Sequence, residues 1–304
     1  MDIYLPIANM SVDAAIIILL GFGVGILSGL FGVGGGFLTT PFLIFYGIPP
    51  TVAVASATTQ ITGASVSGVA AHMKRGGVDL KMGGVMIAGG LVGSLLGAGL
   101  FRLLQASGQV DLVIGILYVV MLGAIGALML RDAAMALGFI PSPDRPAPRR
   151  RHHQWVAALP MRWRFYSSGL YMSPLAPLGL GLVAGILTVL LGVGGGFILI
   201  PAMIYILGMA ARVVVGTSLV VILVVSAATT LIHALSTQGV DIVLALLLLI
   251  GGVVGAQYGA ALTHKLKPDW LRLALAVMIL LVALRMLLGL AWQPPEIFTI
   301  QELG

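Results

Sequence analysis

Long apolar stretches, separated by short polar or glycine-rich breaks, make up most of the chain. Five occur in each half, at 13–31, 36–47, 52–72, 81–101 and 110–130 and again at 174–191, 196–207, 212–235, 241–263 and 270–291. Long uncharged stretches predict membrane helices, because only a backbone with closed hydrogen bonding is stable in hydrocarbon. We therefore expect an all-α polytopic membrane protein with ten helical segments.

The second segment of each half is too short to cross a bilayer. Residues 37–47 give about 16 Å of helix at 1.5 Å per residue, whereas the hydrocarbon core is about 30 Å thick. Each short segment follows a glycine-rich break, so we expect a half-membrane helix that starts near the midplane. The first segment of each half either crosses the membrane fully or forms a re-entrant hairpin with the short helix. Both alternatives stay open, since in both the chain leaves the short helix on the same side of the membrane.

The glycine-rich break occurs twice, 160 positions apart. The sequence LFGVGGGF at 30–37 returns as LLGVGGGF at 190–197, and Pro41 and Pro201 follow at the same distance. Further along, the GVD at 77–79 matches the GVD that ends at Asp241. The similarity extends over about 13–130 and 174–291. Duplication inside apolar sequence is typical of secondary transporters.

Composition excludes an ordinary soluble domain. The chain has 59% hydrophobic and 9% charged residues, against about 25% charged in soluble proteins. It has no cysteine, which excludes disulfides and thiolate metal sites. The formal charge of +6 does not indicate nucleic-acid binding, because seven of the sixteen Lys and Arg lie within 131–164. That cluster suits anionic lipid headgroups.

The positions of the basic residues predict the orientation of the chain. If the two halves are inverted, fourteen of the sixteen Lys and Arg share one face and only Arg102 and Arg285 lie on the other. Parallel halves would divide them eleven to five, so the positive-inside rule favours inversion. We expect a first repeat at 1–130, a cytoplasmic, basic, Pro-rich linker at 131–172 and a second repeat at 173–304, with both termini periplasmic.

The two glycine turns are candidate anion sites. Glycine permits a sharp turn, and the backbone N–H groups at a helix N-terminus have no intrahelical partner. With the helix dipole, they attract an anion without a basic side chain. Polar residues early in the third segment of each half could add donors, although they could equally bond within or between helices. The substrate-binding candidates are Gly34, Gly35, Gly36, Phe37, Ser56, Thr58, Thr59, Gln60, Gly194, Gly195, Gly196, Phe197, Thr217 and Ser218.

Charged residues are absent from the centre of every predicted segment. His72 and His233 lie near corresponding helix ends and are candidates for proton coupling, although an interfacial role fits each of them better. Export of a monoanion needs no coupling ion when the cell interior is negative, because it gains about 2.3 kcal/mol per 100 mV. No nucleotide-binding loop, metal-binding cluster or catalytic motif is present, so we expect neither an enzyme nor a cofactor.

The paired GVGGGF motifs, each followed by a proline, and the polar Ser56-Ala57-Thr58 helix resemble the TauE/SafE sulfite exporter family, also called the toluene sulfonate uptake permeases. The resemblance implies a multi-pass carrier of the prokaryotic inner membrane for sulfite or organosulfonates such as sulfoacetate. An anion channel, or an uptake permease for another small organic or sulfur-containing anion, is the alternative. The glycine-rich stretches 89–99 and 251–259 either pack within the chain or form a homodimer.

Overall fold

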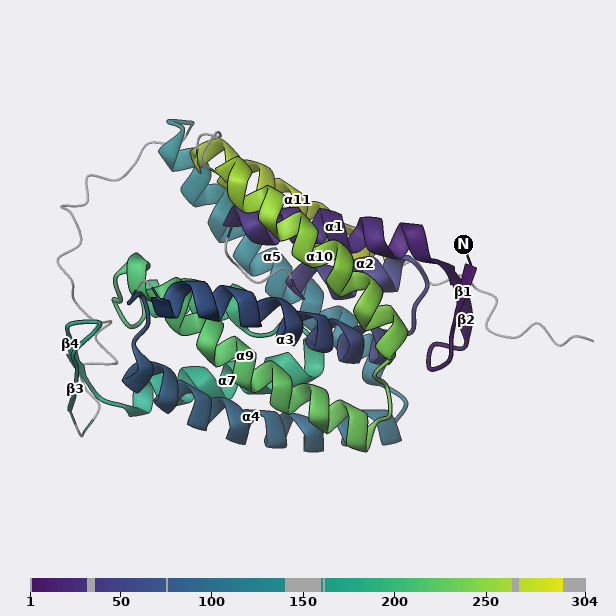
Figure 1. Cartoon of the computed structure of the whole chain (residues 1–304), viewed down its shortest axis with the longest axis horizontal. Coiled ribbons are helices and arrows are strands. Elements are labelled where there is room, and N and C mark those ends of the chain that lie inside the picture. Colours follow the sequence, from purple (N-terminus) through teal and green to yellow (C-terminus); the bar gives the residue numbers. More distant parts are fainter. Residues whose placement is uncertain are drawn as a thin grey trace, which may run out of the picture.

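The structure is a computed structural model that describes residues 2–31, 36–74, 76–139, 160, 162–263 and 268–291. These residues form ten helices and two short β-hairpins (Figure 1). The helices of the first half are α1 (Ala14–Phe31), α2 (Gly36–Phe45), α3 (Pro50–Lys74), α4 (Leu80–Ala106) and α5 (Val110–Ala136). Those of the second half are α7 (Leu175–Leu191), α8 (Gly196–Tyr205), α9 (Ala211–Ser236), α10 (Ile242–Thr263) and α11 (Pro268–Ala291).

Every predicted apolar segment is confirmed as a helix, and the all-α polytopic fold class with it. In the described part of the chain, α4, α5, α9, α10 and α11 are long and apolar enough to cross a membrane. The helices α2 and α8 have 10 residues each, which gives about 15 Å. They are therefore half-membrane helices in length, as predicted.

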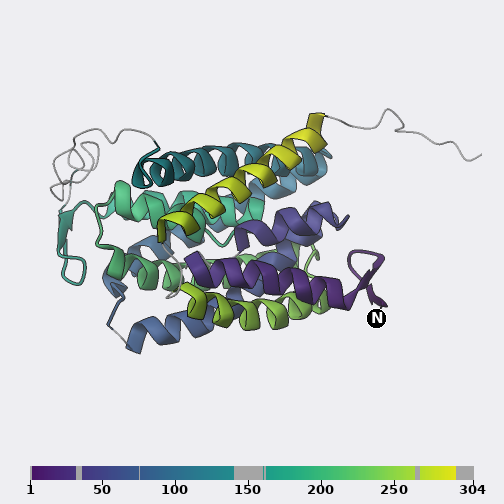
Figure 2. The same ribbon diagram turned by 90° about the horizontal axis from the view of Figure 1, so that it is seen from above.

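Each half packs against the other through corresponding helices. The helix α1 lies along α10, and α7 lies along α4. Since α7 corresponds to α1 and α10 to α4 in the repeat, these two interfaces are equivalent. The remaining large contacts join α3 to α9 and α5 to α11, which are also corresponding pairs. Figure 2 shows α5 and α11 together along one side of the bundle.

Glycines bring the backbones of these helix pairs into contact. A Cβ atom on Gly93 of α4 would lie 2.1 Å from the carbonyl oxygen of Leu182 in α7. Its counterpart Gly255 of α10 would place a Cβ 2.1 Å from the carbonyl oxygen of Phe22 in α1. Apart from Gly99, whose Cβ position is open, the glycines of the stretches 89–99 and 251–259 thus pack inside the chain. A homodimer stays a prediction, and it would have to use other faces.

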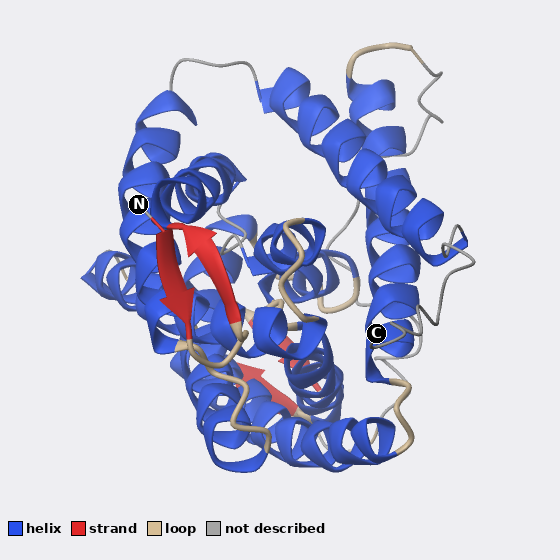
Figure 3. Ribbon diagram, turned by 90° about the vertical axis from the view of Figure 1, so that its right-hand side faces the viewer, coloured by secondary structure: helices blue, strands red, loops and turns tan. Residues whose placement is uncertain are grey.

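The two β-hairpins were not predicted from the sequence. The strands β1 (Asp2–Leu5) and β2 (Met10–Asp13) pair antiparallel, as do β3 (Trp163–Phe165) and β4 (Leu170–Met172). The hairpins lie at opposite ends of the helical bundle (Figures 1 and 2), and Figure 3 shows how small they are beside the helices. The second hairpin is the end of the predicted linker, of which 140–159 and 161 lie outside the described residues.

A buried aspartate fastens each hairpin to the first turn of a helix. Asp79 caps α4 by accepting from the Met82 N–H at 3.0 Å, and its other oxygen accepts from the Ser168 N–H and hydroxyl at 3.0 and 2.5 Å. Asp241 accepts from the Leu244 N–H and from the Ile7 N–H, both at 3.1 Å. The repeated GVD motif therefore anchors the hairpins.

Replacing Asp79 by alanine should destabilise the protein strongly. The substitution removes a helix cap worth about 1 kcal/mol and leaves the buried Ser168 donors without an acceptor, which costs about 1–3 kcal/mol more. Thermal unfolding in detergent should show a clearly lower Tm than for Asp111→Ala, an aspartate exposed at the start of α5. Equal Tm values for the two variants would contradict this role.

Candidate substrate site

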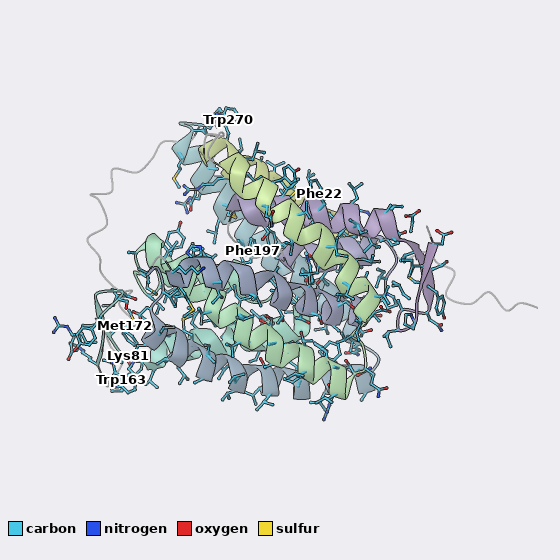
Figure 4. All side chains as sticks on the ribbon, in the orientation of Figure 1. Phe22, Lys81, Trp163, Met172, Phe197 and Trp270 are labelled. Atoms are coloured by element: carbon cyan, nitrogen blue, oxygen red, sulfur yellow. The ribbon has the colours of Figure 1, made fainter. Side chains whose placement is uncertain are left out.

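The two half-membrane helices meet at their N-terminal ends. Phe37 is the second residue of α2 and Phe197 the second residue of α8. Their rings stack with centroids 4.2 Å apart and planes 9° from parallel. Both side chains are almost fully buried, and Phe197 lies at the centre of the molecule (Figure 4). Equivalent positions of the two repeats therefore meet in the core.

The second glycine turn has the backbone that only glycine adopts without strain. Gly192, Gly194 and Gly195 have φ angles of +68°, +69° and +73°, in the left-handed region that disfavours a Cβ atom. Gly192 ends α7, and Gly195 caps α8 without a side-chain hydrogen bond. The first backbone N–H groups of α8 thus have no acceptor within the helix. Gly34 and Gly35 of the first turn lie outside the described residues.

The start of α2 lies directly against the second turn. A Cβ atom on Gly36 would lie 1.9 Å from Cδ1 of Ile61 and 3.3 Å from the carbonyl oxygen of Val193. A Cβ atom on Gly194 would lie 2.8 Å from Cγ2 of the same isoleucine. Ile61, on α3, therefore fills the space between Gly36 and Gly194, and a larger residue at either position would require the Ile61 side chain to move.

Polar side chains from other helices cap the end of α7 beside this turn. Tyr118 of α5 donates its hydroxyl hydrogen to the Leu191 carbonyl. The Nε2 atom of His233 lies 3.0 Å from the Val189 carbonyl, so it carries the proton and donates it. His233 is buried, whereas His72 is half-buried in the last turn of α3. Proton coupling through either histidine stays a prediction.

Several predicted site hydroxyls bond to the protein itself. Ser56 accepts from the Asp241 N–H at 3.2 Å, and Thr217 accepts from the Asp79 N–H at 2.9 Å. Thr58 and Ser218 donate to carbonyls within their own helices, at 2.7 and 2.9 Å. These bonds correspond to the alternative in which such hydroxyls bond within or between helices. Ser56 of α3 lies next to the start of α10, and Thr217 of α9 lies next to the start of α4.

Gln60 is joined to the half-membrane helix α2. The Thr39 hydroxyl donates to Oε1 of Gln60 at 3.1 Å, and both side chains are buried. Thr59, next to Gln60, donates to its own helix at 3.1 Å. A further hydroxyl contact joins Thr62 of α3 to Ser226 of α9 at 3.0 Å. The sequence analysis missed Thr39 and Ser226, although a threonine within so short an apolar segment was a usable signal.

The described residues around the meeting point have little contact with solvent. Phe37, Thr39, Gln60, Gly194 and Phe197 are all buried. An anion bound at the helix N-termini would therefore lie among buried residues. The described residues form ten helices, and two of these, the half-membrane helices α2 and α8, meet in a buried core. This architecture is that of a polytopic membrane protein of the transporter class.

Comparison with known families agrees with this class. The sulfite exporter TauE/SafE family matches residues 17–286, and the chain belongs to that family. Three relatives are named only as probable membrane transporter proteins. YjnA of Bacillus subtilis is 29% identical over 89% of this chain and 98% of its own length. A Xylella fastidiosa protein is 26% identical over 84% and 87%, and MJ0441 of Methanocaldococcus jannaschii is 25% identical over 90% and 95%. No solved structure matches the chain. The protein is thus a membrane transporter.

Proposed function

We propose that this transporter exports sulfite, or a small organosulfonate such as sulfoacetate, across the bacterial inner membrane by alternating access. The observation that carries the proposal is the meeting of α2 and α8 at Phe37 and Phe197 in the buried core. Helix N-termini attract anions through their free N–H groups and dipoles. Two of them beside one point form a site for a single small anion, in agreement with the family.

Neutral donors suit a transported anion better than a buried cation would. Gln60 contributes an amide beside α2, and Thr39 holds it in place. The N-terminal end of α8 contributes backbone N–H groups. Such groups replace part of the hydration of an oxyanion, but they bind it less tightly than an arginine does. The anion can therefore leave on the other side.

The arrangement of the hairpins supports inverted repeats, with the linker on the cytoplasmic side. The two hairpins lie at opposite ends of the bundle (Figure 1). The β3–β4 end is basic, since Lys81 donates to the Arg164 carbonyl at 3.1 Å and lies 5.4 Å from the Trp163 ring centroid (Figure 4). The β1–β2 hairpin instead carries Asp2 and Asp13. By the positive-inside rule, this distribution favours a cytoplasmic β3–β4 end and periplasmic termini.

The proposal can be tested by anion flux from proteoliposomes. We expect saturable, protein-dependent flux of sulfite and sulfoacetate, and little flux of taurine, which has no net charge at neutral pH. An imposed potential of 100 mV should distribute a monoanion about 50-fold toward the positive side, because no coupling ion is needed.

Two outcomes would contradict the proposal. Unitary currents in planar bilayers would indicate an anion channel rather than a carrier. Accumulation of the anion on the negative side, driven by a proton or sodium gradient, would indicate an uptake permease.

A further inference from the structure

An apolar groove opens between α1 and α2. It has a volume of about 620 Å³. Its lining consists of Leu20, Gly23, Val24, Ile26, Leu27, Phe42, Phe45 and Tyr46. Val24, a buried lining residue, belongs to the same hydrophobic cluster as Phe37 and Phe197. The groove therefore lies on the surface of the core that holds the substrate site.

One end of the groove lies beside polar groups. The Tyr46 hydroxyl accepts from the Asp13 N–H at 3.4 Å, at the base of the β1–β2 hairpin. The other lining residues continue along α1 as far as Leu27, four residues before the helix ends. An occupant of this groove would need an apolar chain attached to a polar head.

A cation lies at the polar end. The Arg285 guanidinium of α11 lies 5.3 Å from the ring centroid of Phe45, which lines the groove. In the described part of the chain no carboxylate forms an ion pair with Arg285, which is exposed. An exposed arginine beside an apolar groove is complementary to an amphiphile with an anionic head.

The equivalent place between α7 and α8, beside α5, has different residues at three positions. Val183 stands at the position that corresponds to Gly23. The position that corresponds to Arg285 falls within Gly123-Ala124-Ile125, where no residue is charged. Tyr205, the counterpart of Phe45, donates its hydroxyl hydrogen to Asp132 at 3.1 Å. The open glycine and the arginine beside the groove are therefore not required by the repeated fold.

We propose that this groove binds one acyl chain of an anionic phospholipid whose phosphate pairs with Arg285. The chain lies on Val24 and Leu27, between the two helices. The headgroup lies at the level of Tyr46. A lipid in this place contacts both α1 and α2. It also fills the open space at Gly23, where a Cβ atom would meet no other atom within 4 Å.

Native mass spectrometry of the purified full-length chain tests the proposal with phosphatidylglycerol and phosphatidylcholine of equal chain length. Wild-type protein should retain one phosphatidylglycerol about fivefold more tightly than phosphatidylcholine, as expected for one cation near a phosphate. Arg285→Gln should remove this preference. Gly23→Leu fills the groove and should weaken retention of both lipids.

Gly84→Leu is the matched control, because Gly84 is an exposed helical glycine with equally open space around its Cβ position. It should retain lipid as the wild type does. The proposal fails if the wild type binds the two lipids equally, or if neither Arg285→Gln nor Gly23→Leu changes retention. It also fails if a ten-carbon alkylsulfonate is retained in the groove and phosphatidylglycerol is not.

Discussion

Replacing Gly195 by alanine should reduce anion flux at least about tenfold while the protein still folds. Gly195 caps α8 with φ +73°, where an L-residue costs about 1–2 kcal/mol. The added Cβ would also lie 3.3 Å from the Ala184 Cβ and 3.4 Å from the Thr188 hydroxyl, so the turn has to shift. Misplaced N–H donors that lose about 1.4 kcal/mol toward the anion weaken its binding tenfold.

The same proteoliposome assay measures this effect, together with the Tm of the detergent-purified protein. Gly179→Ala is the matched control, since Gly179 is a glycine of the preceding helix α7 whose Cβ position is open and whose φ is not in the left-handed region. The control should transport normally. Wild-type flux in Gly195→Ala would show that the second glycine turn does not hold the anion.

The sequence predicted the helices well because membrane insertion leaves few alternatives. A long uncharged stretch in the membrane must form its backbone hydrogen bonds within itself, so composition alone predicts that it is a helix. The short length of α2 and α8 could also be predicted from the sequence, because the glycines before Gly36 and Gly196 interrupt the apolar pattern. The sequence repeat then indicated which helix of the second half corresponds to each helix of the first.

The hairpins could not be predicted in this way. The strands β3 and β4 have three residues each, too few for an alternating pattern to be recognised. The hairpin that they form is hydrogen-bonded to Asp79 through Ser168. Asp79 lies more than eighty residues earlier in the chain, and the sequence showed it only as part of a repeated GVD. A contact of that kind becomes visible only in the folded chain.

The candidate site was predicted in part, for a similar reason. The backbone roles of Gly194 and Gly195 follow from residue type, and the structure gives both a left-handed backbone. The roles of hydroxyls depend on their neighbours. Ser56 and Thr217 accept from the backbones of Asp241 and Asp79, and nothing near them in the sequence indicates those partners.

The helix pairs should tolerate no side chain at their glycine contacts. Gly93→Val would place a Cβ 2.1 Å from the Leu182 carbonyl oxygen and 2.9 Å from its Cα atom. Both are backbone atoms, so α4 and α7 would have to separate along their length. Overpacking costs about 1–3 kcal/mol and occasionally more. Because this clash is with backbone atoms, we expect a cost at the upper end and little monodisperse Gly93→Val protein by size-exclusion chromatography.

Gly99→Val separates this clash from the general cost of valine in a helix. Gly99 lies on the same helix, six residues further on, and its Cβ position has no atom within 4 Å. That variant should behave nearly as the wild type does. Gly255→Val should be as damaging as Gly93→Val, because its Cβ would lie 2.1 Å from the Phe22 carbonyl oxygen at the equivalent interface. If Gly93→Val were severe and Gly255→Val mild, α1–α10 and α4–α7 would not be equivalent interfaces. If Gly93→Val were no worse than Gly99→Val, the close packing of α4 on α7 would be wrong.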